Sequence, residues 1–497
     1  MKGSTYLLMV LGILIAKALG LVRNSILASA FGASELTDIY SQVFGIPTFI
    51  FTGIGTALAT LVIKNLNKAE NKSPSAGRRY VSTFMGKISL LIIGITALMY
   101  VFTDPIINVM LPGLDAEFMD KARQMMYIML PSGLFIIIAY IMSGVLQNCK
   151  VFFITSIMSL PYNVIIVASL LVKDIDIMTV SWITTLGWFL HIVILLPNFY
   201  QKGFRFFYRD KNGGGTVAKE RSLEVLYIFI SSMMFQMCFV FDKAAVSHEG
   251  GAATTINYAS TFFVTIASIF VVAMSNVSFP SISKCYERGD KEGVKKMTRQ
   301  LIALLFAIIV PFILVATVFG RDVISIMYER GEFDAKLTSD TAVLFMIYTF
   351  GIFGYVCQEL FNKILYLGSK YAYPVISSVV IMALKPLINI VASKYGVVAV
   401  ALSTTVLFTV YAVVIAIAMT KVTGNYINKE LCLNLLKILI AGALALGVYG
   451  IYSLTGLDFG GRLGFVIPLG ICAVVYVGAI VAFGLVKVLL PGRAEQE

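Results

Sequence analysis

The sequence predicts an all-α polytopic membrane protein with about 14 transmembrane helices, arranged as two parallel six-helix lobes followed by two C-terminal helices. Composition, a series of long apolar runs and an internal repeat predict this class. Of the 497 residues, 58% are hydrophobic and only 13% are charged, and the mean hydropathy is +0.87. A soluble globular domain carries roughly twice that charged fraction, so the composition excludes a soluble fold.

The apolar runs are long enough to cross a bilayer, which takes about 20 helical residues. They lie near 5–30, 37–63, 82–102, 124–147, 151–172, 177–200, 223–247, 253–279, 300–319, 339–367, 372–393, 396–420, 432–454 and 463–489. Lys17 and Arg23 interrupt the first run where a signal peptide would end, so we expect a retained first helix.

The charges of the loops predict the orientation, because lysine and arginine collect on the cytoplasmic side. The loops after the second, sixth and eighth runs are basic, and the loops around Asp115 and Asp334 are acidic. Both chain termini are therefore predicted to be cytoplasmic. The net charge of +12 would by itself suggest nucleic acid, but basic residues confined to alternate loops indicate topology and exclude a nucleic-acid stripe.

An internal repeat predicts the two lobes. The stretch Phe102–Met110, with its acidic loop and the helices that follow, recurs as Phe319–Met327 about 220 residues later. Six runs per copy make the repeat parallel, and such transporters bind substrate between the halves. The predicted domains are an N-lobe over 1–201, a basic cytoplasmic linker over 202–222, a C-lobe over 223–421 and the last two helices over 422–497.

Charged residues inside the apolar runs are the candidate functional residues, because a charge in hydrocarbon is costly unless it faces protein or water. Lys17 and Arg23 are predicted to line a central cavity, although Arg23 could also snorkel to the interface. Asp38 follows at the start of the second run. It could pair with one of these cations or cap the helix that begins there.

The second half of the chain repeats this pattern. Asp242 and Lys243 are neighbours that point about 100° apart on a helix, so each needs another partner: an interhelical salt bridge, or for Asp242 a cation or a proton. Lys363 lies one turn after Glu359, which predicts a local ion pair. Lys385 lies near mid-membrane with no evident local partner and is expected to face the cavity.

Five prolines within the runs are expected to kink their helices, because proline removes a backbone hydrogen bond. They are Pro47, Pro131, Pro161, Pro311 and Pro386. Enzyme signatures such as a P-loop or a His-Glu-x-x-His motif are missing from the sequence. The outer loops are too short for a catalytic domain, so a transporter is favoured over an enzyme.

Three segments carry a family resemblance. The opening segment AKALGLVRNSILASAFGASELTDIY over 16–40, followed by FGIP over 44–47, resembles the start of the MurJ (MviN) lipid II flippases. FPSISK over 279–284 and MYERGEF over 327–333 are similar to two further family segments. The resemblance extends over essentially the whole chain.

The resemblance implies the fold of the multidrug/oligosaccharidyl-lipid/polysaccharide exporter superfamily, with a groove between the last two helices for an isoprenoid tail. It implies a non-enzymatic flippase for an undecaprenyl-pyrophosphate-linked saccharide, acting as a monomer in the bacterial cytoplasmic membrane. Arg23 falls on the family's cavity arginine, Lys17 on a position that is usually arginine, and Asp38 on the family's aspartate. The predicted substrate-binding set is Lys17, Arg23, Asp38, Lys243, Lys363 and Lys385.

Several positions depart from the family pattern. Asn24 replaces an aspartate, and Phe51, Thr56 and Thr261 stand where the family has charged residues. For a sodium site such as some members have, Asp242 and Asn389 match and Thr404 is a candidate donor, but Ser393 replaces a second aspartate. These departures leave the saccharide open, and the coupling ion open between Na⁺ and H⁺.

Two alternatives remain. A drug exporter of the same superfamily would share the fold, although a cationic cavity would repel cationic drugs. A membrane glycosyltransferase or polymerase would need catalytic carboxylates and a large outer loop.

Overall fold

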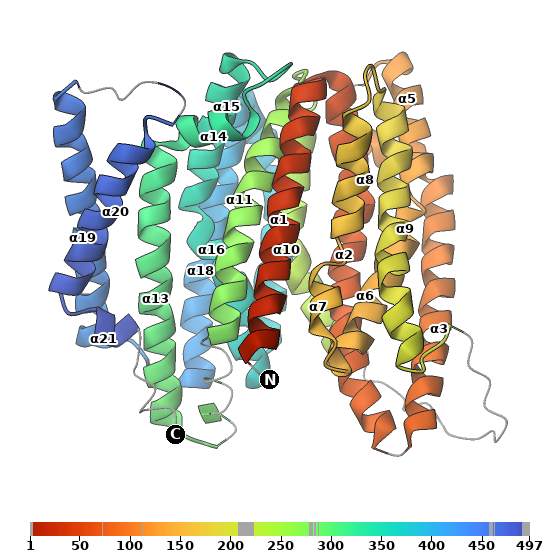
Figure 1. Cartoon of the computed structure of the whole chain (residues 1–497), viewed down its shortest axis with the longest axis horizontal. Helices are drawn as coiled ribbons and strands as arrows, with labels where there is room; N and C mark the ends of the chain where they lie inside the picture. Colours follow the sequence, from red (N-terminus) through yellow and green to blue (C-terminus); the bar gives the residue numbers. More distant parts are fainter. Residues whose placement is uncertain are drawn as a thin grey trace. The chain divides into compact units, whose positions relative to one another are not determined.

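The computed structural model of the chain describes residues 3–71, 73–112, 114–206, 223–277, 282, 285–286, 288–456, 461 and 463–489. This part is helical and contains no strand (Figure 1), so the all-α prediction is confirmed. Residues 207–222 of the predicted linker, and most of the FPSISK segment, lie outside the described residues.

The chain divides into two compact units. The first comprises Met1–Asn257 and Arg330–Phe333, and the second comprises Tyr258–Glu329 and Asp334–Glu497. The helix of residues 223–245 belongs to the first unit, although the repeat groups it with the C-lobe. It does so because it packs against the second helix of the chain. The lobe boundaries read from the repeat stay a prediction.

The helices of the first unit follow the predicted runs, with breaks inside some of them. They are α1 (Gly3–Phe31), α2 (Glu35–Glu70), α3 (Pro74–Val101), α4 (Thr103–Met110), α5 (Ala116–Met129), α6 (Ser132–Asn148), α7 (Phe152–Ser156), α8 (Leu160–Leu170), α9 (Ile177–Gln201), α10 (Leu223–Ala245) and the start of α11 (Ala252–Val277).

The second unit contains the remainder of α11 and all later helices. They are α13 (Lys291–Val318), α14 (Gly320–Tyr328), α15 (Ala335–Phe350), α16 (Ile352–Leu367), α17 (Ala372–Ala392), the 3₁₀ turn η1 (Ser393–Tyr395), α18 (Val397–Thr423), α19 (Lys429–Leu454), α20 (Val466–Ala482) and α21 (Val486–Leu489).

Membrane-spanning helices dominate the described part of the chain. Eight helices of this part are long and apolar enough to cross a bilayer when α5 and α6 count as one (Ala116–Asn148), or nine when α15 and α16, bent by 42° at their junction, also count as one span. The chain is therefore a multi-pass membrane protein. The count of about 14 stays a prediction, because α8 and α20 are shorter apolar helices and some side chains of α1, α2 and α10 are not described.

Polar caps define where several helices begin. Ser73, Asp176, Asp290, Asp334 and Asn428 each accept a hydrogen bond from a backbone N–H in the first turn of the helix that follows. Such side chains satisfy N–H groups that have no partner within the helix.

The predicted prolines act in two ways. Pro131 lies between α5 and α6, and Pro161 lies in the first turn of α8, so these two coincide with interruptions of the helix. Pro47, Pro311 and Pro386 lie inside continuous helices. A proline at the start of a helix costs little, because the backbone N–H that it lacks would have no partner within the helix.

Close helix packing builds the core of the first unit. α2 and α6 pack along their length, and a Cβ on Gly144 would lie 2.8 Å from the carbonyl oxygen of Ala59. Phe51 is fully buried, and its ring fills the space above Gly133. Small residues at such crossings let apolar helices approach closely. Phe51 is therefore a packing residue, which explains why a charged residue is absent there.

The last two long helices pack against α13 within the second unit (Figure 1). Ile438 and Ala441 of α19 meet Ala307 of α13 in a small apolar cluster, and the Tyr476 hydroxyl of α20 donates to the Ala307 carbonyl at 2.9 Å. Their remaining faces carry exposed large apolar side chains, as expected for surfaces in lipid. The predicted groove for an isoprenoid tail stays a prediction.

Candidate functional site

Arg23 lies on α1, half-buried, against Tyr162 of α8. Its Nη2 and Nε donate to Oδ1 of Asn24 at 2.7 and 3.1 Å, and its Cζ lies 5.0 Å from the centre of the Tyr162 ring. No salt bridge to Arg23 is found among the described residues. An amide and an aromatic face thus orient the guanidinium without neutralising its charge.

An aromatic cluster supports this arrangement. The Tyr162 ring contacts Trp188 at 5.0 Å and His191 at 5.5 Å between ring centroids, and Trp188 stacks on His191 at 4.6 Å. All three rings are buried. Packed rings in fixed positions hold the face over which Arg23 lies, so the guanidinium is preorganised.

Lys17 lies six residues before Arg23 on α1 and is half-buried. Within the part of the chain that the structure describes, its ammonium has neither a hydrogen bond nor a salt bridge. Six residues correspond to about 9 Å of rise and roughly 240° of rotation, so Lys17 and Arg23 project from different faces of the helix. The first helix therefore carries two cations without a carboxylate partner among the described residues.

The sequence suggested that Asp38 pairs with Lys17 or Arg23, or caps its own helix α2. Its carboxylate has a third environment. Asp38 lies in the first turn of α2, but its carboxylate accepts the backbone N–H groups of Gly251 and Thr254, at 2.9 and 2.5 Å. It thus caps α11, and it is only 3% exposed. The expectation of a pair with Lys17 or Arg23 is not borne out by these contacts, because both carboxylate oxygens bind the start of α11.

Lys243 lies next to Asp38 in this arrangement. It is 1% exposed on α10 and donates to the Ser41 carbonyl of α2 at 3.2 Å. Lys243 and Asp38 also attract each other electrostatically. Three helices of the first unit, α2, α10 and α11, are therefore joined by one buried anion and one buried cation. Lys243 thus has a backbone partner on a neighbouring helix, and the interhelical salt bridge expected for it stays a prediction.

Lys385 of α17 is completely buried and has local partners, contrary to the sequence-based expectation. Its Nζ donates to Asn389 Oδ1 at 2.7 Å, to Ser403 Oγ at 2.5 Å and to the Val400 carbonyl at 3.4 Å. Ser403 Oγ lies 2.7 Å from the Val400 carbonyl and 3.1 Å from Asn389 Oδ1, and its single proton is donated to one of these two acceptors. Ser403 was missed by the sequence analysis, which selected its neighbour Thr404.

The other predicted residues are distributed over both units. Asp242 is fully buried in the first unit, and Thr404 is fully buried on α18 in the second. Lys363 is half-buried on α16, one turn after Glu359. Within the described residues, no group of three or more His, Cys, Asp or Glu side chains is arranged to hold a metal ion.

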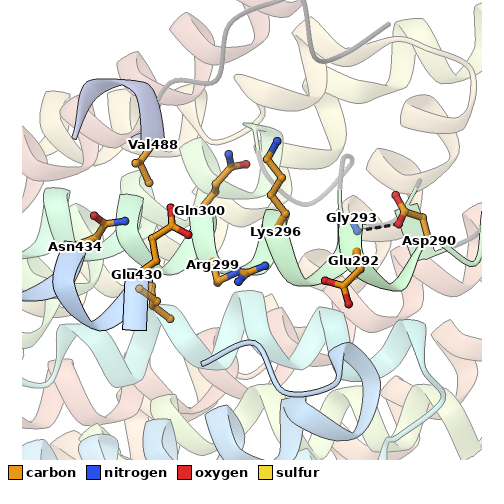
Figure 2. Close-up of a pocket in the computed structure, with 10 residues that line it drawn as sticks. Asp290, Glu292, Gly293, Lys296, Arg299, Gln300, Glu430, Asn434 and Val488 are labelled. Atoms are coloured by element: carbon orange, nitrogen blue, oxygen red, sulfur yellow. Dashed lines mark hydrogen bonds between the residues drawn. The ribbon is translucent and has the colours of Figure 1, made fainter. Parts of the chain in front are cut away.

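A polar pocket lies between the N-terminal ends of α13 and α19, with a volume of about 660 Å³ (Figure 2). Two cations, Lys296 and Arg299, line it together with three carboxylates, Asp290, Glu292 and Glu430. Glu292 already binds Lys295 at 2.7 Å. The lining therefore has no excess of positive charge, unlike α1, and it does not have the chemistry of a pyrophosphate site.

Comparisons with known proteins agree with this architecture. A family model described as "Lipid II flippase MurJ" matches residues 27–460. A probable lipid II flippase MurJ of Buchnera aphidicola is 23% identical over 388 residues, covering 76% of this chain and 75% of the relative. One from Synechocystis is 24% identical over 374 residues, covering 71% and 69%.

Solved structures agree at the level of the fold. A lipid II flippase MurJ in an inward closed conformation superposes with a TM-score of 0.76 at 21% identity, over 96% of this chain and 98% of that one. An inward-facing multidrug resistance MATE transporter reaches 0.64 at 12% identity, over 82% and 96%. Since the family model spans most of the sequence, this chain belongs to the lipid II flippase MurJ family.

Proposed function

We propose that this chain is a flippase that moves an undecaprenyl-pyrophosphate-linked saccharide, with lipid II as the first substrate to test, across the bacterial cytoplasmic membrane by alternating access. The curated relatives named above are described as probable lipid II flippases, and the sequence match to them is extensive. The reaction is transport, so the chain acts without catalytic residues or a cofactor. We further propose that it acts as a monomer with both termini cytoplasmic.

The observation that carries this proposal is the uncompensated guanidinium of Arg23. A half-buried cation that is oriented by Asn24 and Tyr162, without a carboxylate partner among the described residues, is suited to receive an anion. Asn24 contributes because its amide oxygen accepts hydrogen bonds from Arg23 as a carboxylate would. The amide carries no negative charge, so the charge of the guanidinium is not neutralised. A pyrophosphate supplies the matching negative charge.

Lys17 extends the same cationic helix. It lies about 9 Å along the axis from Arg23, on a different face of the helix, so it would contact another part of the same large ligand. We assign the anion contacts to Lys17 and Arg23. Asp38 and Lys243 are assigned to holding α2, α10 and α11 together, since their contacts are to backbone groups of those helices.

The fold alone would also suit a drug exporter, given the likeness to MATE transporters. The charge of α1 argues against it, because Lys17 and Arg23 would repel cationic drugs. A membrane glycosyltransferase or polymerase finds no support in the contacts described above, which place buried Asp38 on a helix N-terminus.

The test is lipid flipping in proteoliposomes that contain fluorescent lipid II and an impermeant quencher. Loss of a charge-assisted contact costs about 1.5–3 kcal/mol, so we expect Arg23→Ala to weaken lipid II binding about 10- to 150-fold and to slow flipping accordingly. Arg23→Lys should retain part of the activity, and Arg205→Ala, which removes an exposed arginine of the same unit, should retain all of it. An Arg23→Ala variant that flips at the normal rate would refute the assignment.

A further inference from the structure

The oxygen atoms around Lys385 resemble a binding site for a monovalent cation. Three neutral oxygens, from the Asn389 amide, the Val400 carbonyl and the Ser403 hydroxyl, surround one buried positive charge. Amide, carbonyl and hydroxyl oxygens are the ligands that hard cations prefer. In this chain the cation is the ammonium of a side chain, held by its stem on α17.

The family resemblance implies a sodium site that includes Asn389 and an oxygen of α18, and the structure tests whether a metal ion fits there. Asn389 Oδ1 already accepts a hydrogen bond from Lys385 at 2.7 Å. Ser403 Oγ accepts from Lys385 as well. A Na⁺ ion at these oxygens would lie directly against a second positive charge, so the residues present do not fit sodium.

We propose that Lys385 is a tethered cation that takes the place of a metal ion between α17 and α18. The site does not require Na⁺ to join these two helices, because the lysine ammonium supplies a positive charge there. This inference is independent of the transported substrate, since it concerns the contact of two helices within the second unit.

The hydrogen-bond geometry supports this assignment over a role for Lys385 in substrate binding. A lysine ammonium has three N–H donors, and the three named acceptors match that number. The side chain is fully buried, whereas the charge of Arg23 is half-exposed. Withdrawing the ammonium toward a phosphate would remove its hydrogen bond to the Asn389 amide oxygen at 2.7 Å, which is costly in a buried site.

The serine at position 393 is consistent with a site whose cation is the ammonium of Lys385. It stands where a second carboxylate would raise the affinity for Na⁺, and its hydroxyl instead donates to the Ile390 carbonyl of its own helix. The three neutral oxygens of Asn389, Val400 and Ser403 stabilise one positive charge, and neutral oxygens of this kind bind a free monovalent ion weakly. A covalently attached ammonium overcomes weak binding, because its effective concentration at the site is high.

The experiment measures thermal stability of the purified protein in detergent at constant ionic strength, first in N-methyl-D-glucamine chloride and then with NaCl, KCl or methylammonium chloride. Wild-type protein should show the same Tm in all four salts. Lys385→Ala should have a lower Tm in N-methyl-D-glucamine, and Na⁺ or methylammonium should raise it saturably, on the order of 5 °C. Lys394→Ala, which removes an exposed lysine of the adjacent turn, should behave as wild type.

If Lys385→Ala does not fold, the variant Asn389→Ala tests the proposal instead. Asn389→Ala keeps the ammonium but removes one acceptor, so its Tm should fall and no added cation should restore it. The proposal is overturned if Na⁺ stabilises the wild-type protein selectively, if folded Lys385→Ala responds to none of the cations, or if Asn389→Ala either retains the wild-type Tm or becomes Na⁺-responsive.

Discussion

Replacement of Asp38 by alanine should destabilise the first unit, because the carboxylate caps α11 from a neighbouring helix. Asp38 accepts hydrogen bonds from the Gly251 and Thr254 N–H groups and is 3% exposed, so water cannot replace it without a rearrangement. The same carboxylate attracts Lys243, which is also buried.

The magnitude follows from these contacts. Loss of an N-cap costs about 0.5–2 kcal/mol, and leaving a buried charge without its partner costs about 3–5 kcal/mol. The two effects overlap, since one side chain makes both interactions, so we expect a total loss of about 3–5 kcal/mol. Asp38→Asn should lose less, because an amide oxygen still accepts one backbone N–H.

Thermal unfolding of the purified protein measures this loss, and a double-mutant cycle isolates the part that involves Lys243. Lys243→Met removes the buried cation, so Asp38→Asn should be less harmful in that background than in wild type. Thr37, at the same turn of α2, provides a matched control as Thr37→Ser. If Asp38→Ala unfolds at the wild-type temperature yet no longer binds lipid II, the capping role is refuted and direct substrate binding is favoured.

Two further predictions concern the loops and the pH response. A cysteine introduced at Asp115 or Asp334 should react with an impermeant thiol reagent added from outside, and one at Gly214 should not; the reverse pattern contradicts the orientation predicted from the loop charges. Hydrogen bonds from Arg123 hold the pKa of Asp104 below its ordinary value of 3.8. The ion pair therefore contributes to stability above that pH, and the contribution is lost as the pH falls through the lower folded-state pKa. Asp104→Asn should flatten the decrease of Tm in this acid range, and a wild-type acid profile in that variant would contradict the argument.

Regular features of the molecule were predictable from the sequence because they depend on local composition. The long apolar runs and the all-helical class follow from hydropathy, and the run over 339–367 corresponds to α15 and α16. The bend between those two helices at Gly351 was not predicted, because hydropathy does not register the tight packing of Gly354 against the Phe408 backbone. Family membership was predictable from the segment that contains Arg23, and the family match confirms it.

The partners of the buried charges were not predictable in the same way. Asp38 and the N–H of Gly251 are 213 residues apart, and no periodicity relates the start of α2 to the start of α11. Lys385 and Ser403 are 18 residues apart on two helices joined by a turn, so their contact depends on the angle between the helices. A sequence pattern identifies a charge that needs a partner, whereas packing determines which oxygen provides it.

The contacts of the cations divide them into two functional groups. Lys243 and Lys385 donate to oxygens of the protein and are almost fully buried, so their charge is used in holding helices together. Arg23 and Lys17 are half-buried without a carboxylate partner among the described residues, so their charge is available to a ligand. An activity assay alone does not separate the groups, because removal of any of these cations can stop transport. Stability in different salts does separate them: loss of Lys385 should be compensated by a small cation, whereas loss of Arg23 should leave the Tm nearly unchanged and weaken only the binding of the anionic lipid.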